Sequence, residues 1–291
     1  MVRLAIGYLL GCAERLTRLL GHDLDTSVVY AALAWENVRD HTLPVQGESA
    51  SDAEARLLGR TPLSIYRLSR VMGMPYETTR RHVGRLTASG LCARQGSGIV
   101  ATTLAQAPAA RIGSETWEAT MALLAELGAL GLRSPPPRVV SDVQTERRVA
   151  RLSIEYFLAG LSTITRALDL DMLTALMFLA INRHNFQDAL ADRDFVDLLP
   201  DDRRRPISTY LLARQLGLVY ETARRHLDKL QKAGLCVRIE TGLMIPAEVL
   251  ARPALATAGV EAWDVTLAFL DQLANVGVTI SAPEPHRVQA G

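Results

Sequence analysis

The sequence is poor in cysteine and in aromatic residues. It contains three cysteines among 291 residues, and aromatic residues make up 5% of the chain. An odd and sparse cysteine count argues against a secreted disulfide scaffold and favours a reducing compartment, so we expect a cytoplasmic protein. Cys92 and Cys236 lie in matching sequence contexts, each directly after Gly-Leu. A small buried residue and a redox-sensing pair are both open interpretations of these two positions.

Long apolar runs are also absent. The apolar stretches around Phe157 and Phe178 are interrupted by charged residues, and each is shorter than the ~20 residues that a membrane-spanning helix needs. Residues 9–12 (LLGC) resemble a lipoprotein processing site, but charged residues follow them on a helical pattern. The same pattern recurs inside the chain at residues 156–168. We therefore interpret this segment as a structural helix and expect no membrane association.

The usual spacings of catalytic and metal-binding residues are missing as well. The six histidines include no pair four residues apart. His82 and His226 have no further His, Cys or carboxylate at ligand spacing, which argues against a metal site. The sequence shows no glycine-rich phosphate-binding loop, no nucleophile elbow and no paired carboxylates suited to acid–base chemistry. We therefore expect a protein that is not an enzyme and that uses no cofactor.

A basic motif of eleven residues occurs twice. Residues 76–86 read YETTRRHVGRL and residues 220–230 read YETARRHLDKL, at an offset of 144 positions. Further matches, such as Tyr8 with Tyr156, recur at offsets of 148 and 146, and they extend the repeat over most of the chain. The sequence therefore consists of two copies of one unit, residues 1–137 and residues 138–291.

Each copy shows the same order of predicted elements. In the first copy we expect a helix over residues 3–20 and a second helix to about residue 40, with an N-cap at residues 25–27. Residues 41–56 are polar and rich in loop-forming residues, and they predict a loop. The last helix of each copy carries an apolar stripe that starts at a tryptophan. The stripes are Trp117, Met121, Leu124 and Leu127 in the first copy and Trp263, Leu267, Leu270 and Leu273 in the second.

Between these helices the pattern predicts a helix, a turn and another helix. Ile65, Leu68 and Met72 form an apolar stripe at helical spacing, and Gly73 is a natural helix stop. The second copy repeats the pattern over residues 207–233. Two helices joined by a glycine-containing turn of three or four residues make a helix-turn-helix.

After residue 90 the pattern changes from helical to strand-like. Two short apolar segments flank the glycine-containing residues 95–98, which predicts a hairpin. Residues 235–245 repeat this arrangement. A hairpin that follows a helix-turn-helix is the wing of a winged helix, so we place winged helix-turn-helix segments at about residues 60–104 and 204–248.

Positive charge is concentrated in these two segments. The net charge of the chain is +1, but residues 60–94 carry seven arginines and one acidic residue, a net +6. Residues 203–238 carry nine lysines and arginines and two acidic residues, a net +7, which leaves −12 for the remainder. Two basic islands in an acidic chain are typical of a surface directed at nucleic acid.

These segments resemble the bacterial winged helix-turn-helix transcription regulators, in the broad sense of the MarR-like and GntR-like families. The resemblance rests on residues 68–74 (LSRVMGM), on residues 77–91 (ETTRRHVGRLTASGL) and on their second copies, about 40 residues in each unit. It implies a mainly α fold, with two tandem winged helix-turn-helix units whose flanking helices form an intramolecular pseudo-dimer. This chain departs from the MarR-like pattern because both halves lie in one polypeptide and only one clear helix follows each hairpin.

The resemblance also implies that two recognition helices, at about residues 76–89 and 220–233, enter adjacent major grooves of double-stranded DNA. Arg80 is expected nearest to guanine, Thr78 at a phosphate, and the arginines of the hairpins at the DNA backbone or the minor groove. The predicted DNA-binding residues are Tyr76, Thr78, Arg80, Arg81, Arg85, Arg94, Tyr220, Thr222, Arg224, Arg225, Lys229 and Arg238.

The sequence thus predicts a DNA-binding transcription regulator, and several alternatives stay open. One is a non-enzymatic tandem winged-helix module that binds proteins, and another is a plasmid replication initiator. A homodimer of the whole chain and a small-molecule effector of unknown identity are open as well. Asn37 with Asp40, and Asn185 with Asp188, are polar positions on otherwise apolar helices. We expect them to bridge the two units, with an effector pocket as the alternative.

Overall fold

The computed structural model describes residues 2–39, 61–102, 107–132, 142–187 and 199–278. This part of the chain is mainly α-helical with two small antiparallel sheets, which confirms the expected mainly α fold. None of its helices is long and apolar enough to cross a membrane. The loop predicted over residues 41–56 lies outside the described residues.

The described elements follow the repeat. The first copy contains α1 (Val2–Leu20), α2 (Leu24–Val38), α4 (Ile65–Met72), α5 (Tyr76–Ala88), β1 (Cys92–Gln95), β2 (Gly98–Ala101) and α6 (Ala107–Ala129). The second copy contains α7 (Val143–Leu168), α8 (Met172–Asn185), a short 3-10 helix (Asp201–Arg203), α9 (Thr209–Gln215), α10 (Tyr220–Lys232), β3 (Val237–Ile239), β4 (Gly242–Met244), α11 (Ala247–Leu250) and α12 (Pro253–Asn275). The short helix α11 was not predicted.

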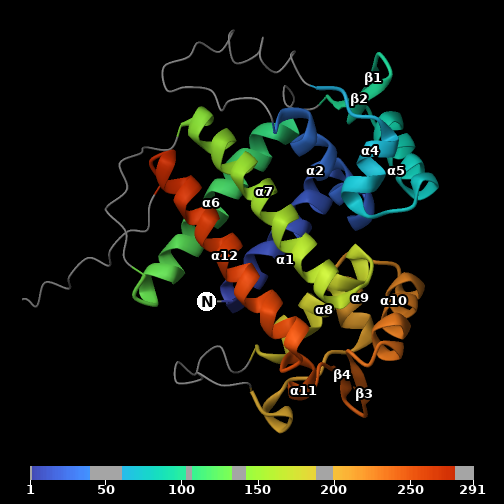
Figure 1. Ribbon diagram of the computed structural model, residues 1–291, viewed down its shortest axis with the longest axis vertical. Helices are drawn as coiled ribbons and strands as arrows, with labels where there is room; N and C mark the ends of the chain where they lie inside the picture. Colours follow the sequence, from blue (N-terminus) through green and yellow to red (C-terminus); the bar gives the residue numbers. More distant parts are fainter. Residues whose placement is uncertain (1, 40–60, 103–106, 133–141, 188–198, 279–291) are drawn as a thin grey trace, which may run out of the picture.

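The long helices form the centre of the molecule. Helix α7 runs through the middle and packs against α12, the last helix of its own copy, and against α6, the last helix of the other copy (Figure 1). Helix α1 packs against α2, α6 and α8. Most buried apolar side chains of both copies belong to one continuous cluster, and Phe186 and Leu199 form a small separate one. The two copies therefore share a hydrophobic core.

Tyrosine hydroxyls hold the first and last helices together inside this core. The Tyr8 hydroxyl lies 2.7 Å from the Thr120 hydroxyl and 2.7 Å from the Ser153 hydroxyl, and it thereby connects α1, α6 and α7. The Tyr156 hydroxyl lies 2.9 Å from that of Thr266 on α12. The two tyrosine rings are 5.8 Å apart between centroids. The contact is thus repeated in both copies, with one additional hydrogen bond in the first.

We expect the two tyrosines to contribute unequally to stability. Tyr8→Phe removes a buried hydroxyl with two partners and should lower the free energy of unfolding by about 2 kcal/mol. Tyr156→Phe removes one hydrogen bond and should cost about 1 kcal/mol. Urea titration of both variants measures the difference, and equal effects would contradict the unequal sharing of hydrogen bonds.

The apolar stripe predicted for the last helices is only partly buried. Leu124, Leu127 and Leu273 are buried, but Leu267 is 39% exposed. Thr266 is buried instead, because its hydroxyl reaches Tyr156 from inside the helix bundle. Position 266 rather than position 267 therefore faces the helix bundle.

All three cysteines are buried thiols. Burial raises the pKa of Cys12 to about 11 and that of Cys236 to about 11, and it also raises the pKa of Cys92. A raised pKa suppresses the thiolate form that reacts with oxidants. The burial favours the interpretation of Cys92 and Cys236 as small core residues. Cys12 lies inside α1, which agrees with the structural helix expected there.

The second helix of each copy is capped by an aspartate. Asp23 precedes α2 and its carboxylate accepts a hydrogen bond from the Thr26 backbone N–H at 2.9 Å. Asp171 precedes α8 and accepts from the Thr174 backbone N–H at 3.0 Å. The N-cap was expected at residues 25–27, two positions too late. An aspartate at this position satisfies a free N–H group and favours the helix dipole.

Each hairpin is fixed to its unit by a buried asparagine. Asn37 on α2 donates to the carbonyls of Thr61 and Ile99, at 2.8 and 3.1 Å, and accepts from the backbone N–H of Ala101 at 2.8 Å. Asn37 was expected to cap or bridge the interface between the two units, but all three of its side-chain hydrogen bonds are to its own copy, so the expected bridge was wrong. Asp40 and Asp188 lie outside the described residues.

The second copy repeats this junction. Asn185 on α8 donates to the carbonyls of Arg205 and Leu243 and accepts from the Ile245 N–H at 2.9 Å. Ile207 and Leu243 form an antiparallel bridge beside it. Gly242 allows this close approach, because a Cβ at this position would lie 2.7 Å from the carbonyl oxygen of Ile207. The hairpin is therefore joined to the chain that precedes α9 as well as to α8.

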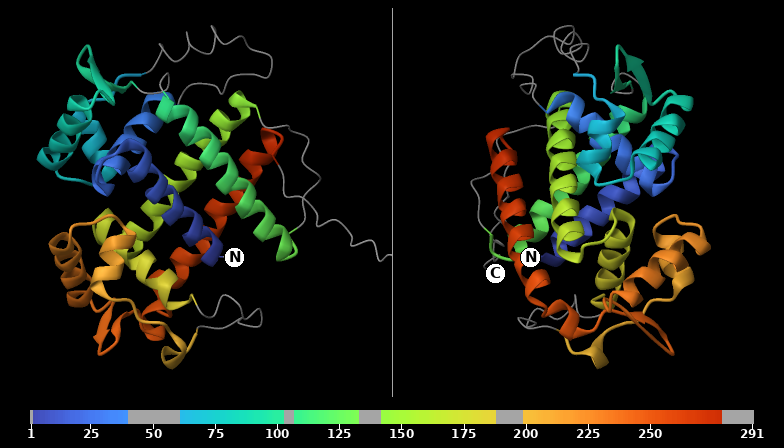
Figure 2. Two further views of the ribbon diagram at one scale, coloured as in Figure 1. Left: turned by 180° about the vertical axis from the view of Figure 1, so that it is seen from behind. Right: turned by 45° about the vertical axis from the view of Figure 1, so that its right-hand side comes forward.

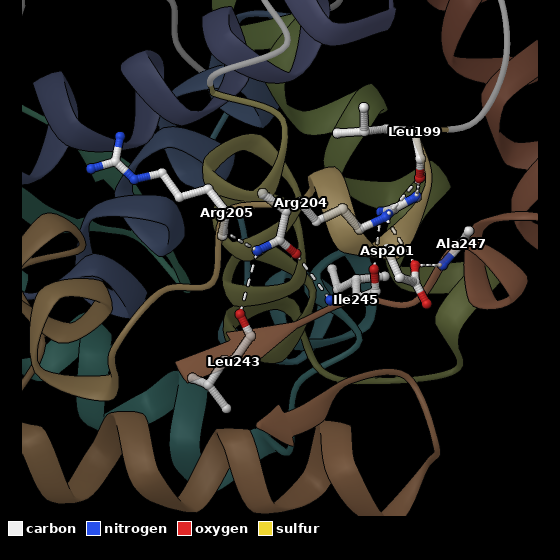
Figure 3. Close-up of polar contacts among 8 residues, drawn as sticks. Leu199, Asp201, Arg204, Arg205, Leu243, Ile245 and Ala247 are labelled. Carbon is white, nitrogen blue, oxygen red and sulfur yellow. Dashed lines mark hydrogen bonds and ion pairs between the residues drawn. The ribbon is translucent and has the colours of Figure 1, made fainter. Parts of the chain in front are cut away.

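One arginine of the second basic segment is part of this structure. The Arg204 guanidinium is buried and donates to the carbonyls of Leu199 and Ile245, and it lies 3.1 Å from the Asp201 carboxylate (Figure 3). Burial lowers the pKa of this guanidinium. Arg204 therefore anchors the segment between α8 and α9, and its charge does not belong to the exposed basic surface.

Candidate nucleic-acid interface

The two basic helices are α5 and α10, and each is held by one apolar face. Thr79, Val83 and Leu86 of α5 are buried, as are the matching residues of α10. Gly73, in the turn before α5, has a φ of 60°, a left-handed conformation that suits glycine. Helix α4 packs against α5, and α9 packs against α10. The predicted recognition helices thus begin where expected, and each ends one residue early.

The apolar spacing of the basic motif predicts one buried helix face, with the Arg, His and Lys side chains off that face, and for the two histidines this prediction is wrong. His82 is 3% exposed and His226 is 6% exposed. The His82 Nδ1 atom lies 2.8 Å from the Thr26 hydroxyl, and the His226 Nδ1 atom lies 2.7 Å from the Thr174 hydroxyl. Burial lowers the pKa of His82. The histidines therefore fix each basic helix to the start of the preceding long helix.

The capping aspartates reach the same basic helices. Asp23 forms an ion pair with Arg85, at 2.5 Å between Oδ2 and Nη1. Asp171 forms one with Lys229, at 2.6 Å, and a second contact with His226 at 3.3 Å. Arg85 and Lys229 were expected at DNA phosphates. Both side chains are about half-exposed, and in the structure each is paired with the capping aspartate of the preceding helix.

Asp171 is expected to make stability depend on pH. Burial opposes ionisation of its carboxyl group, but hydrogen bonds from His226, Lys229 and Thr174 outweigh burial and hold its pKa well below the ordinary value of 3.8. The unfolded chain therefore takes up this proton before the folded protein does. The resulting stabilisation is complete above the unfolded pKa and is lost as the pH falls towards the folded one.

Asp171→Asn keeps an N-capping side chain but removes the charge. It should lower stability at neutral pH, and its difference from the wild type should shrink below about pH 4. Asp169→Asn is the matched control, since Asp169 is exposed and has a left-handed backbone that asparagine tolerates. Urea unfolding across the pH range measures both variants. A difference for Asp171→Asn that stays constant with pH would contradict the role of the charge.

The outward face of each basic helix carries arginine and tyrosine. Tyr76, Arg80 and Arg81 are exposed, as are Tyr220, Arg224 and Arg225. Thr78 and Thr222 are half-buried at the edge of this face. Within the described part of the chain, Arg81 and Arg225 form no ion pair with a carboxylate. These two arginines therefore present their full charge to solvent.

Arg80 and Arg224 differ from their neighbours because each has a carboxylate partner. The Arg80 Nε atom lies 2.8 Å from Glu77, and the Arg224 Nε atom lies 3.0 Å from Glu221. These pairs are exposed, and such pairs are weak. In each pair the Nε atom of the guanidinium faces a carboxylate three residues earlier on the same helix. Sequence patterning did not indicate this partnership.

The arginines of the hairpins are exposed too. Arg94 lies on β1 and Arg238 on β3, each opposite a residue of the second strand. The Arg238 guanidinium donates to the Thr209 hydroxyl at 3.2 Å. In the second copy, this contact ties the hairpin arginine to the first turn of α9.

Two further exposed tyrosines, on α4 and α9, were not among the predicted DNA-binding residues. Tyr66 on α4 is 67% exposed and Tyr210 on α9 is 69% exposed. They occupy equivalent places in the repeat, 144 positions apart, and both lie off the apolar stripe of their helix. A large aromatic side chain left in solvent at the same place in both copies was the signal available in the sequence.

The two basic helices lie on the same edge of the molecule. In Figure 1, α5 and α10 are both at the right, with β1–β2 at the upper end of this edge and β3–β4 at the lower end. The reversed view in Figure 2 shows the same order on the opposite side of the picture. We call the exposed arginine and tyrosine side chains of α4, α5, α9 and α10 the basic edge. Its members are Tyr66, Arg67, Arg70, Tyr76, Arg80, Arg81, Arg85, Tyr210, Arg214, Tyr220, Arg224 and Arg225.

No family model matches the sequence, and neither a curated protein nor a solved structure matches it. Among the described residues, no group of three or more His, Cys, Asp or Glu side chains is placed to hold a metal ion.

Proposed function

We propose that the protein binds double-stranded DNA through the basic edge and acts as a transcription regulator. The observation that carries the proposal is the repetition of one exposed basic helix on the same edge of a shared core. Each copy presents a tyrosine and two arginines, held from behind by a buried histidine. Exposed arginines suit phosphates and the major-groove edge of guanine.

On this proposal, each helix–turn–helix with its hairpin is a winged helix-turn-helix unit. The shared core then plays the part of a dimer interface within one chain, since α1, α6, α7 and α12 come from both copies. Such a pseudo-dimer holds two recognition helices at a fixed separation, which suits two half-sites on one face of DNA. Because the exposed Gly84 is replaced by the exposed Asp228 in the second copy, the two half-sites need not be identical.

Salt dependence tests the proposal. Fluorescence anisotropy of the protein with duplexes selected from a random pool should show binding at low salt. If 6–10 phosphates are contacted, affinity should fall by about 10³- to 10⁵-fold between ~50 and ~200 mM salt. A protein that binds no DNA at the lower salt concentration is not a DNA-binding regulator.

A protein-interaction module is the second candidate, and the exposed apolar side chains favour it. Val219 is 72% exposed beside Tyr220, and Tyr66 and Tyr210 are exposed as well. Tyrosine and apolar residues can contact thymine methyl groups, but they are also common in protein interfaces. Absence of DNA binding together with capture of a defined protein through Tyr66 and Tyr210 would favour this candidate.

A further inference from the structure

Two cavities of the central helices occupy equivalent places in the repeat. The first, of about 360 Å³, lies between α1, α6 and the end of α8. The second, of about 470 Å³, lies between α7, α12 and the end of α2. Helices α7 and α12 are the second copies of α1 and α6, and α8 is the second copy of α2. Each cavity thus lies between the first and last helices of one copy and the second helix of the other.

The second cavity is lined by an acidic residue as well as by arginines. Glu155 lines it and lies 3.5 Å from the side-chain amide of Gln272. Arg151 is stacked on the ring of Trp35, at 5.5 Å, and donates to the backbone carbonyl of Arg39. A carboxylate and two arginines therefore line the same space.

The first cavity has no carboxylate at this position, and its one acidic lining residue, Glu126, stands instead at the repeat position of Gln272, 146 positions earlier. Gly7 occupies the place of Glu155, 148 positions earlier in the chain. A Cβ atom on Gly7 would meet only the Arg183 guanidinium, at 4.0 Å, so the space beside this glycine is open. Glycine in a helix interior is about 1 kcal/mol less favourable than alanine. Gly7 therefore lowers the stability of α1.

Positive charge gathers around the first cavity. Arg3, Arg15 and Arg183 line it, and Glu126 is the one acidic residue among its described lining residues. None of these three arginines forms an ion pair with a carboxylate in the described part of the chain. Burial lowers the pKa of Arg3, because its charge is partly removed from water. Three arginines that face one cavity without a carboxylate partner suit an anionic ligand.

The aromatic rings beside this cavity are already covered by guanidinium groups. Arg3 lies over the Phe186 ring at 4.5 Å, and Arg204 lies over the same ring at 4.9 Å. Arg15 lies over the Tyr8 ring at 5.6 Å. A ligand therefore finds little free ring surface for stacking. The remaining apolar lining includes Leu4, Ile6 and Leu123, which suits an aliphatic chain.

We propose that the cavity between α1, α6 and α8 binds a small organic oxyanion with an aliphatic body, held by Arg3, Arg15 and Arg183. The head group is a carboxylate or a phosphate, both of which match the planar fork of arginine. The ligand contacts helices of both copies and stabilises their association. This proposal does not depend on DNA binding.

Isothermal titration calorimetry with octanoate, octyl phosphate and the neutral octanamide tests the proposal on the full chain. Binding of octanoate or octyl phosphate without binding of octanamide is the expected result, and the anion that binds more tightly identifies the head group. Equal binding of octanamide, or no binding of either anion at millimolar concentration, would overturn the proposal.

Two variants assign the binding to this cavity. Gly7→Glu introduces the carboxylate that the second cavity has at Glu155, and Arg183→Met removes an exposed guanidinium without touching the core. Each should weaken binding of the anion at least tenfold, while Glu155→Gln, the matched change in the second cavity, should leave it unchanged. Circular dichroism checks that each variant is folded. Wild-type affinity in folded Gly7→Glu protein would place any binding elsewhere and overturn the assignment.

Discussion

Replacement of Arg80, Arg81, Arg224 and Arg225 by alanine is expected to abolish specific DNA binding. Each arginine that contacts a base or a phosphate contributes about 1–3 kcal/mol, so the fourfold variant should lose roughly a thousandfold or more in affinity. The slope of log affinity against log salt should become shallower by about 3 to 4, since fewer counterions are released. Fluorescence anisotropy at several salt concentrations measures both quantities.

The matched control removes arginines from elsewhere on the surface. Arg111 on α6 and Arg147 on α7 are exposed and lie outside the basic edge. The Arg111→Ala, Arg147→Ala double variant should bind DNA within about twofold of wild type, because long-range charge effects are screened at physiological salt. A fourfold variant that binds as tightly as this control would show that the basic edge is not the DNA-binding surface.

Asn185→Ala is expected to have the largest single effect on stability. It leaves the carbonyls of Arg205 and Leu243 and the N–H of Ile245 without their side-chain partner (Figure 3). Buried polar groups left unsatisfied cost about 1–3 kcal/mol each, so we expect a loss of about 3 kcal/mol after local relaxation. Urea unfolding with an unchanged denaturant slope measures this loss.

Asn182→Ala on the same helix is the matched control. Asn182 lies one turn before Asn185, and its Oδ1 atom has no hydrogen-bond partner among the described residues. Its replacement should change stability by less than about 0.5 kcal/mol. Asn37→Ala should behave like Asn185→Ala, because the junction is repeated in the first copy. Similar small effects at positions 185 and 182 would mean that the asparagine does not hold the hairpin.

The sequence predicted those features that depend on local patterns. The apolar spacing of Ile65, Leu68 and Met72 and the stop at Gly73 gave the helix and turn before α5. The repeat itself strengthened these predictions, because the same pattern had to fit two different sequences. The hairpins followed from short strand-like segments on either side of glycine.

The errors concern polar side chains whose partners are distant in sequence. From the sequence alone, His82 is part of a basic surface. In the structure it lies beside the hydroxyl of Thr26, 56 positions earlier in the chain. Asn37 looks like an interface residue until a hairpin 62 to 64 positions later supplies its partners. A buried polar group requires hydrogen-bond partners, but helical periodicity does not reveal which distant group supplies them.

In the candidate site, too, local sequence patterns predicted some features, and tertiary contacts determined the others. Repetition of Arg-Arg in both copies predicted the exposed arginines of α5 and α10, and these side chains are exposed in the structure. Arg85 and Lys229 belong to the same motif, yet their ion pairs with Asp23 and Asp171 arise from packing of the basic helices on α2 and α8. Charge in a motif therefore predicted the surface, and tertiary contacts decided which charges remain available.

A hydroxyl-radical footprint on a selected DNA site tests the central proposal most directly. If one chain places both basic helices on DNA, the wild-type protein should protect two segments on one face, about one helical turn apart. Arg80→Ala with Arg81→Ala should remove protection of one segment, and Arg224→Ala with Arg225→Ala should remove protection of the other. A single protected segment that depends on only one pair of arginines would contradict the proposal that one chain binds DNA with both basic helices.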